Sequence, residues 1–367
     1  MTPPEPDPSG TALYTALARI VVELADQDRL RSFSLPYPRR VQLVLDRTGL
    51  YCIRRGLPPP KGVPELIEWC RDVPAGDPLF QVPDTLVDPG TTLVDAVGAM
   101  PSRSCLELAS HGPQGEVEQE AVQLLAEPAV RRGPVERHRR RRLFLAQHPV
   151  ITRRHRIQPS WNTAVWTSIS DLYERVPASL LTDGDLELCG TCGLPYRSEG
   201  RRDGSTGVWC EGEACPADVP PETVRQAGLA KILRPSLRAF LSLPWHTEQA
   251  ALSELTRAEV PYEFAGAGLG GHVVRGRVGR TWLVRAYDRR QPALLAARVR
   301  EDRAAHGGPL LAVVPRWAWD APGYRTAFAA AIGDDVAQDV VLSTPEDLPG
   351  RLTDSPKKPN GTESPDA

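Results

Sequence analysis

The hydrophobic residues of the N-terminal part of the chain recur with a helical period. On a helix that begins at Ser9, the apolar face consists of Leu13, Leu17, Ile20, Val21 and Leu24. Two more helices are expected after Pro38 and at Pro64, and their predicted core-facing residues are Val41, Val44, Leu45, Ile53, Leu66, Ile67 and Trp69. Further helical patterns cover residues 92–97, 104–109 and 116–125. This part of the chain is therefore predicted to be mostly α-helical.

The pattern changes in the C-terminal part, where short apolar runs alternate with amphipathic ones. Strands are predicted at residues 262–264, 272–274, 281–286, 309–314 and 339–342, and helices at 247–259, 292–305 and 322–332. Strands that alternate with helices in this way indicate an α/β domain. The residues in between are expected to hold a short helix at 172–181 and a longer helical pattern at 221–241.

These patterns divide the chain of 367 residues into several parts. In order, we expect a disordered lead-in (1–10), a helical domain (11–158), a linker with a short helix (159–187), a small central module (188–217), an α/β domain (218–346) and a disordered tail (347–367). The composition, with 41% hydrophobic and 25% charged residues, is typical of a soluble protein. No apolar run approaches about 18 residues and no secretory signal is recognisable, which favours a cytoplasmic protein without a membrane span.

Four of the seven cysteines form two close pairs in the central module. Cys189 and Cys192 are separated by two residues, and Cys210 and Cys215 by four. Two such pairs joined by a loop can surround one ion, and tetrahedral zinc prefers sulfur ligands in this arrangement. The spacing predicts a zinc ribbon, whose four thiolates leave no open position and make Zn²⁺ structural. Disulfides or chance clustering are the alternatives.

The segment 131–156 is the most basic stretch of the chain, with ten arginines and a single acid, Glu136. Such a segment in a near-neutral protein favours binding to the phosphate backbone of DNA or RNA. The residues expected to contact phosphates are Arg137, Arg139, Arg140, Arg141, Arg142, Arg153, Arg154 and Arg156. A solvated helix face or a contact with an acidic partner protein are the alternatives, because Phe144 is the only large aromatic residue identified for stacking a base.

Several short motifs resemble a known family. Pro244-Trp-His-Thr-Glu248, Trp282-Leu-Val-Arg-Ala-Tyr-Asp288 and Gln291-Pro-Ala-Leu-Leu-Ala296 are similar to the restriction-endonuclease-like protein encoded beside prokaryotic PIWI-RE proteins. Pro36-Tyr-Pro38, Pro58-Pro-Pro60 and the segment 142–149 resemble the helical domain that accompanies it. The resemblance implies a three-gene defence island that also encodes a helicase, so that a PIWI-RE protein and a helicase are expected partners.

The resemblance also implies a nuclease site of the PD-(D/E)xK type, in which acids hold a divalent metal ion and a lysine assists. Glu248 matches the helical acid, although a plain solvated acid is the alternative for it. Arg285 stands where the family has Asp, and Tyr287 stands at the lysine position. An arginine repels the metal ion that a carboxylate would hold, so we expect an inactive nuclease fold. Its C-terminal domain is thus expected to be restriction-endonuclease-like and α/β in class.

An active site would need a rearrangement, in which Asp288 with Arg290, or Glu301 with Arg303, replaces the missing pattern with help from Glu254 or Glu263. Glu248 and Asp288 are accordingly the expected remnants of catalysis, and Mg²⁺ is expected only if the site is active. Further phosphate contacts are expected from Arg275, Arg277, Arg280 and Arg285 near the core strand. The leading hypothesis is a nucleic-acid-associated accessory component of the island, with an active DNA endonuclease and a zinc-ribbon transcription regulator as alternatives.

Overall fold

The computed structural model describes residues 8–353 except 28–29, 31–32, 34, 113–114, 131–134, 159–160, 201–205, 217, 267 and 277–278. The expected disorder is wrong at the inner edge of both termini. Helix α1 (Pro8–Asp26) begins within the predicted lead-in. Helix α15 (Leu348–Thr353) begins within the predicted tail, because Leu348 and Leu352 are buried against the large sheet. Residues 1–7 and 354–367 lie outside the described part of the chain.

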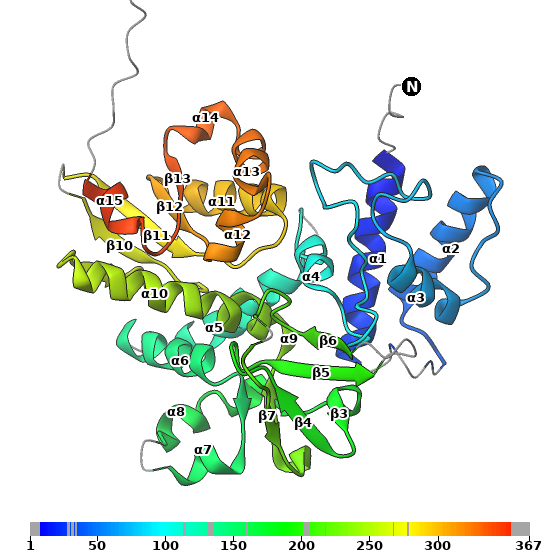
Figure 1. Ribbon diagram of the computed structural model, residues 1–367, viewed down its shortest axis with the longest axis horizontal. Helices are drawn as coiled ribbons and strands as arrows, with labels where there is room; N and C mark the ends of the chain where they lie inside the picture. Colours follow the sequence, from blue (N-terminus) through cyan, green and yellow to red (C-terminus); the bar gives the residue numbers. More distant parts are fainter. Residues whose placement is uncertain are drawn as a thin grey trace, which may run out of the picture.

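The N-terminal part is helical, as the periodicity predicts. Its helices are α1, α2 (Arg39–Arg54), α3 (Val63–Asp72), α4 (Arg103–Ala109), α5 (Val117–Val130) and α6 (Val135–Gln147). All five apolar residues predicted for the inner face of α1 are buried, and α1 packs against α2, α3 and α4. Figure 1 shows α1 as the central blue helix of this region. Burial of a continuous apolar stripe supplies the stability that an isolated helix lacks.

Two predictions for the helical part are wrong. Ile53 of α2 is 65% exposed, because it lies beyond the face that carries the buried Val41 and Val44. Residues 92–97 form turns and an isolated bridge between Val94 and Pro101 in place of a helix. The side chain of Asp95 explains this difference, because it accepts hydrogen bonds from two backbone amides that follow it, at 2.8 and 2.7 Å. Such local bonds compete with helix formation.

Short antiparallel strands form the centre of the chain. One sheet orders β1 (Val150–Ile151), β8 (Lys231–Leu233) and β2 (Tyr173–Arg175). The other orders β3 (Leu181–Thr182), β4 (Asp185–Leu188), β5 (Pro195–Gly200) and β6 (Thr206–Cys210), and β7 (Glu222–Val224) also pairs with β4. Short helical segments flank these sheets: α7 (Arg153–Ile157), α8 (Thr163–Thr167), η1 (Ser170–Leu172), η2 (Ala178–Leu180) and η3 (Ala227–Leu229).

The prediction of helices at 172–181 and across 221–241 is wrong, because strands of these sheets occupy much of both segments. Most of residues 172–182 belong to the strands β2 and β3 and the short turn between them, and residues 222–233 contain β7 and β8. Between the two strands, Gln226 adopts a left-handed backbone conformation with φ of 51°, which interrupts a helix. The first α-helix after residue 221 is α9 (Pro235–Leu237), which continues through the π-helical turn η4 (Arg238–Ser242) into α10 (Leu243–Arg257).

The C-terminal part contains a five-stranded mixed sheet with the order β13-β12-β11-β10-β9. Its strands are β9 (Tyr262–Phe264), β10 (His272–Arg275), β11 (Thr281–Ala286), β12 (Leu310–Val313) and β13 (Val340–Ser343). The strands β9, β10 and β11 are antiparallel neighbours, whereas β11, β12 and β13 run parallel. Parallel neighbours require crossover connections, and these contain α11 (Pro292–His306), α12 (Arg316–Asp320), α13 (Tyr324–Ile332) and α14 (Asp334–Ala337). The predicted order of strands and helices is confirmed here.

Both faces of this sheet are covered. Residues of α11 and α13 form a core with one face, and residues of α10 and α15 form a core with the other. In Figure 1, α10 lies across the sheet on the side of α6, and the two helices are in contact. A third core runs from α1 through α6 to η4 and the first turn of α11, so it joins the helical and α/β parts of the chain. Among the described residues, no helix combines the length and apolar character needed to cross a membrane.

Candidate functional site

The four cysteines of the central sheet converge. Cys189 follows β4, Cys192 lies in the turn before β5, Cys210 ends β6 and Cys215 lies in the turn after it, and their sulfurs all lie within 4.8 Å of one another. A tetrahedral ion with Zn–S bonds of about 2.3 Å separates its sulfurs by about 3.8 Å. All four cysteines are free, and the sulfurs of Cys192 and Cys210 are 3.5 Å apart. The cluster can therefore hold a metal ion.

The backbone around the cysteines suits this role. Gly193 has a φ of 69°, which closes the turn after the first pair, and its amide donates to the carbonyl oxygen of Cys189 at 2.9 Å. The amide of Gly212 donates to the sulfur of Cys210 at 3.3 Å. Hydrogen bonds between the thiols lower the pKa of Cys189 to about 6 and of Cys215 to about 5, and raise the pKa of Cys192. Thiolates are the species that bind metal.

The loop beside the cysteines is tied to both larger parts of the chain. The carboxylate of Glu211 accepts from Arg238 of η4 at 2.9 Å. The carboxylate of Glu213 accepts from the backbone amide of Arg103 in α4 at 2.6 Å and lies 3.7 Å from Arg290, which follows β11. The cysteine cluster thus sits where the helical part, α10 and the α/β part meet.

Glu248, the predicted helical acid, is buried in α10 and fully paired. It is 5% exposed, and Arg142 of α6 binds both of its carboxylate oxygens, one of them at 2.9 Å. The Nε2 atom of His272 on β10 lies 2.9 Å from the same carboxylate. Burial raises the pKa of Glu248, but Arg142 and His272 together bring it below its usual value. The alternative of a plain solvated acid is therefore wrong.

Arg142 was expected to contact phosphates, and the structure instead places it inside the protein. Its side chain is 5% exposed, and its Nε atom donates to the carbonyl oxygen of Leu269 at 2.7 Å. Gly270 makes room for it, since a Cβ atom at this position would overlap the guanidinium group. The sequence carried a signal for this orientation, because Arg142 lies on the same helical face as the buried Leu145 and Ala146.

Asp288, the second predicted remnant, is also held by an arginine from the helical part. Arg103 of α4 donates to its carboxylate at 2.6 Å, and the Asp288 side chain is 11% exposed. The predicted phosphate contact Arg285 on β11 is only 12% exposed, with an ion pair of 2.6 Å to Asp302 and a longer one to Glu118. The prediction of a phosphate contact at Arg285 is therefore wrong, because two internal carboxylates neutralise it.

The space between these groups is small. Glu248, Asp288, Arg142 and Arg285 line a cavity of about 20 Å³. That volume suffices for about one water molecule. The acids considered for a rearranged site, Glu254, Glu263 and Glu301, do not line this cavity, which is bounded only by described residues. A metal ion together with a phosphodiester does not fit there without movement of the surrounding side chains.

The other predicted phosphate contacts lie near the surface. Arg137, Arg139, Arg140, Arg153, Arg154 and Arg156 are exposed, whereas Arg141 is half-buried and donates to the hydroxyl of Ser168 at 2.9 Å. Arg275 is exposed, and Arg280 pairs with Asp339 at 2.8 Å. Residues 131–134 and Arg277 lie outside the described residues. Phosphate binding by the exposed arginines stays a prediction.

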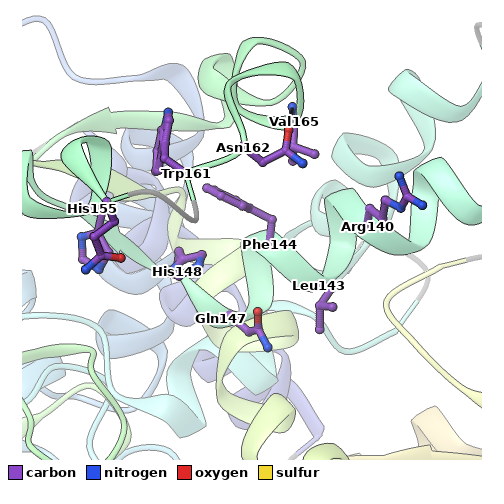
Figure 2. Close-up of a pocket in the computed structure, with 10 residues that line it drawn as sticks. Arg140, Leu143, Phe144, Gln147, His148, His155, Trp161, Asn162 and Val165 are labelled. Atoms are coloured by element: carbon purple, nitrogen blue, oxygen red, sulfur yellow. Dashed lines mark hydrogen bonds between the residues drawn. The ribbon is translucent and has the colours of Figure 1, made fainter.

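Aromatic side chains gather beside these arginines, which the sequence pattern did not indicate. Phe144 of α6 lies 5.5 Å from Trp161 and 4.7 Å from His148, and His148 lies 5.5 Å from His155 of α7. These residues line a pocket of about 320 Å³, and Figure 2 shows the Phe144 ring extending toward Trp161. Phe144 is therefore not the only aromatic residue available. No local pattern connects Trp161 with α6, because β1 and α7 separate the two in sequence.

Fold and site together define a protein in which a helical part, a four-cysteine module and a mixed α/β sheet meet around a closed centre of paired acids and arginines. Residues 13–152 match the family model described as pPIWI_RE three-gene island domain Y. This region extends from α1 to β1 and includes Arg142. The match supports the expected association with pPIWI-RE three-gene islands, and the α/β part of the chain lies outside the matched residues. Comparisons with curated proteins and with solved structures gave no match.

Proposed function

We propose that this chain is a nucleic-acid-binding accessory component of a pPIWI-RE defence island, built on a restriction-endonuclease-like fold that does not cleave. The order α10, β9, β10, β11, α11, β12 supports such a fold, since the acid Glu248 on the first helix contacts His272 of the antiparallel strand β10. The expected partners are a PIWI-RE protein and a helicase of the same island, in a cytoplasmic setting.

The paired state of Glu248 carries this proposal. A carboxylate that binds a divalent ion must offer it an oxygen lone pair. Both oxygens of Glu248 are bonded to the guanidinium of Arg142, and His272 reaches one of them as well. Arg142 belongs to the region that matches the island domain. The helical part of the chain therefore supplies the guanidinium group that binds Glu248 of the nuclease-like part.

The cysteine cluster is proposed to hold a structural Zn²⁺ ion. Four soft sulfur ligands select zinc among the common divalent ions, and they leave no position for water. Beside the cluster, Glu211 accepts from the side chain of Arg238 in η4, and Glu213 accepts from the backbone amide of Arg103 in α4. The ion would therefore fix the relation between the helical part and the α/β part, and its role would be separate from catalysis.

The exposed arginines of α6 and α7 are proposed to bind the phosphate backbone of DNA or RNA. In the described part of 131–156, Glu136 is the only acid, and it lies 3.6 and 3.2 Å from Arg139 and Arg140. Exposed pairs of this kind are weak and yield readily to a polyanion. The transcription-regulator alternative gains no support from these contacts, because none of them distinguishes one sequence from another.

The decisive experiment incubates the purified full-length chain with plasmid DNA and with single-stranded DNA and RNA, in the presence of Mg²⁺ or Mn²⁺. We expect binding in gel-shift assays and no increase in nicked, linear or shortened product. The comparison variants are Glu248→Gln and Asp288→Asn, with circular dichroism to verify folding. Metal-dependent cleavage that is lost in either folded variant would establish an active endonuclease and overturn the non-cleaving assignment.

A further inference from the structure

The pocket beside the arginines is open, mixed in character and built by consecutive elements. Its volume is about 320 Å³, and residues of α6, α7, α8 and their connections form its walls. Phe144, His148, His155 and Trp161 supply aromatic surface, and Gln147 and Asn162 supply carboxamides. The volume lies in the range of small-molecule sites, in which apolar walls carry a few polar groups.

The aromatic rings are only partly covered by protein. Phe144 and Trp161 are half-buried and meet edge to face, with an interplanar angle of 73°. This geometry leaves ring surface directed into the pocket. An unpaired nucleobase stacks on such a surface, because every base offers a π-face to an aromatic side chain.

The two histidines add planar, uncharged surface. Burial lowers the pKa of both His148 and His155. The backbone amide of Thr152 donates to Nδ1 of His155 at 3.1 Å, which assigns the proton of the neutral ring to Nε2. His155 thus offers a donor at the edge of the pocket, and the carboxamide of Gln147 offers both a donor and an acceptor. These groups suit the polar edge of a base.

The surroundings of the pocket carry positive charge. Arg140 lines it, and the exposed Arg139, Arg154 and Arg156 lie on the same two helices. Arg156 also lies 5.3 Å from the ring of Trp166, which neighbours Trp161. Positive charge around an aromatic pocket is the combination that single-stranded nucleic acids require, since phosphates and bases are bound at the same time.

From this combination we propose that the pocket binds an unpaired base of a single-stranded nucleic acid, while the neighbouring arginines hold its phosphates. The proposal rests on the proposed nucleic-acid-binding function and narrows it, because a duplex keeps its bases stacked and cannot fill the pocket. The arginines then supply affinity for any strand, and Phe144 and Trp161 supply the preference for unpaired bases.

The test compares three probes of equal length by fluorescence anisotropy: oligothymidylate, an abasic deoxyribose-phosphate oligomer and a duplex, with oligouridylate to separate RNA from DNA. We expect the wild-type chain to prefer the base-containing single strands over the abasic oligomer. Stacking contributes about 1–3 kcal/mol per base, so Phe144→Leu or Trp161→Leu should weaken binding of oligothymidylate about 5- to 150-fold. Binding of the abasic oligomer should stay unchanged, which also shows that the variants are folded.

Two controls separate the pocket from the rest of the molecule. Trp319→Leu removes another half-buried tryptophan that has an arginine neighbour, Arg325 at 4.9 Å, and should change no affinity. Phe144→Tyr keeps the ring and should retain the preference for base-containing strands. A tighter complex with oligouridylate or with oligothymidylate decides between RNA and DNA as the natural strand.

The two proposals fail in distinguishable ways. Equal binding of oligothymidylate, abasic oligomer and duplex by the wild-type chain, all weakened by the combined variant Arg139→Gln, Arg140→Gln and Arg154→Gln, would overturn the base pocket and leave backbone binding intact. Undetectable binding of every probe would overturn nucleic-acid binding itself. Loss of abasic-oligomer binding in Phe144→Leu, with Phe144→Tyr unchanged, would assign the ring to positioning the arginines and would also overturn the base pocket.

Discussion

At the scale of single residues, the decisive feature is the burial of Arg142 against Glu248. One side chain comes from α6 and the other from α10, and both are nearly inaccessible to solvent. A buried ion pair contributes little compared with an apolar pair, but removal of one partner leaves a charge without compensation. The pair therefore determines which substitutions the centre of the protein tolerates.

We expect Arg142→Met to lower the free energy of unfolding by about 3–5 kcal/mol, because Glu248 would keep only His272 as a partner. Arg139→Met removes an exposed arginine from the same helix and should change the free energy of unfolding by at most about 0.5 kcal/mol. Denaturant unfolding measures both values. In the double variant Arg142→Met and Glu248→Leu the destabilisation should be smaller than in Arg142→Met alone. If the destabilisation of the double variant equals the sum of the destabilisations of Arg142→Met and Glu248→Leu, the two residues are not coupled.

The same carboxylate predicts a pH dependence. The pKa of Glu248 lies below its usual value in the folded protein, so its ionised form stabilises the fold above the unfolded value of 4.5. This stabilisation is lost as the pH falls through the folded pKa. Unfolding measured between about pH 6 and about pH 3 should therefore show a smaller acid destabilisation in Glu248→Gln than in wild type. Parallel curves for the two proteins would contradict the lowered pKa.

At the scale of elements, the cysteine module and helix α6 have separate tasks. The module joins short strands that bury few apolar side chains around the cysteines, among them Leu194 and Leu243. A metal ion can replace the missing core in so small a unit. Helix α6 directs Arg142 inward and its exposed arginines outward, so one element connects the closed centre with the basic surface.

Metal analysis of the purified chain should find about one zinc ion per chain. Cys192→Ser with Cys210→Ser should abolish it, whereas Cys52→Ser, a buried cysteine of α2, should leave it unchanged. Removal of zinc with a chelator should accelerate amide exchange in β4, β5 and β6 more than in β11, β12 and β13, because only the former depend on the ion. Unchanged metal content in the double cysteine variant would place the ion elsewhere.

At the scale of the whole molecule, the helical and α/β parts are joined by shared contacts. One hydrophobic core includes residues of both, and Arg103 and Arg142 from the helical part pair with Asp288 and Glu248 of the α/β part. The basic surface and the closed centre are connected through α6, which carries both Arg142 and exposed arginines. A nucleic acid that binds to the basic surface therefore does not have to separate Arg142 from Glu248.

This arrangement predicts how affinity depends on salt. The combined variant Arg139→Gln, Arg140→Gln and Arg154→Gln should reduce the slope of log K against log salt by about 0.7 for each phosphate of a single strand that is no longer neutralised. The matched variant Arg39→Gln, Arg47→Gln and Arg54→Gln removes three exposed arginines from α2 and should leave the slope unchanged. Binding of oligothymidylate over a series of salt concentrations measures both slopes. Equal slopes in the two variants would show that the arginines of α6 and α7 do not bind the phosphates of the oligonucleotide.

The sequence determined those features that depend on neighbours along the chain. Periodicity predicted α1, α10, α11 and the five strands of the large sheet, because their apolar faces repeat within one element. The cysteine cluster was predictable because its spacing is local. The periodic rule failed at 172–181 and 221–241, where strand partners distant in sequence decide the conformation.

Only the tertiary structure decided the roles of the charged and aromatic residues. The position of Arg142 on the apolar face of α6 indicates burial, but only the packing of α6 against α10 provides Glu248 as its partner, whereas Arg139 stays exposed. Phe144 and Trp161 form one pocket only after the chain folds back through α7. Sequence thus determines what a segment can bury or bind, whereas packing determines which side chain finds a partner inside and which remains available outside.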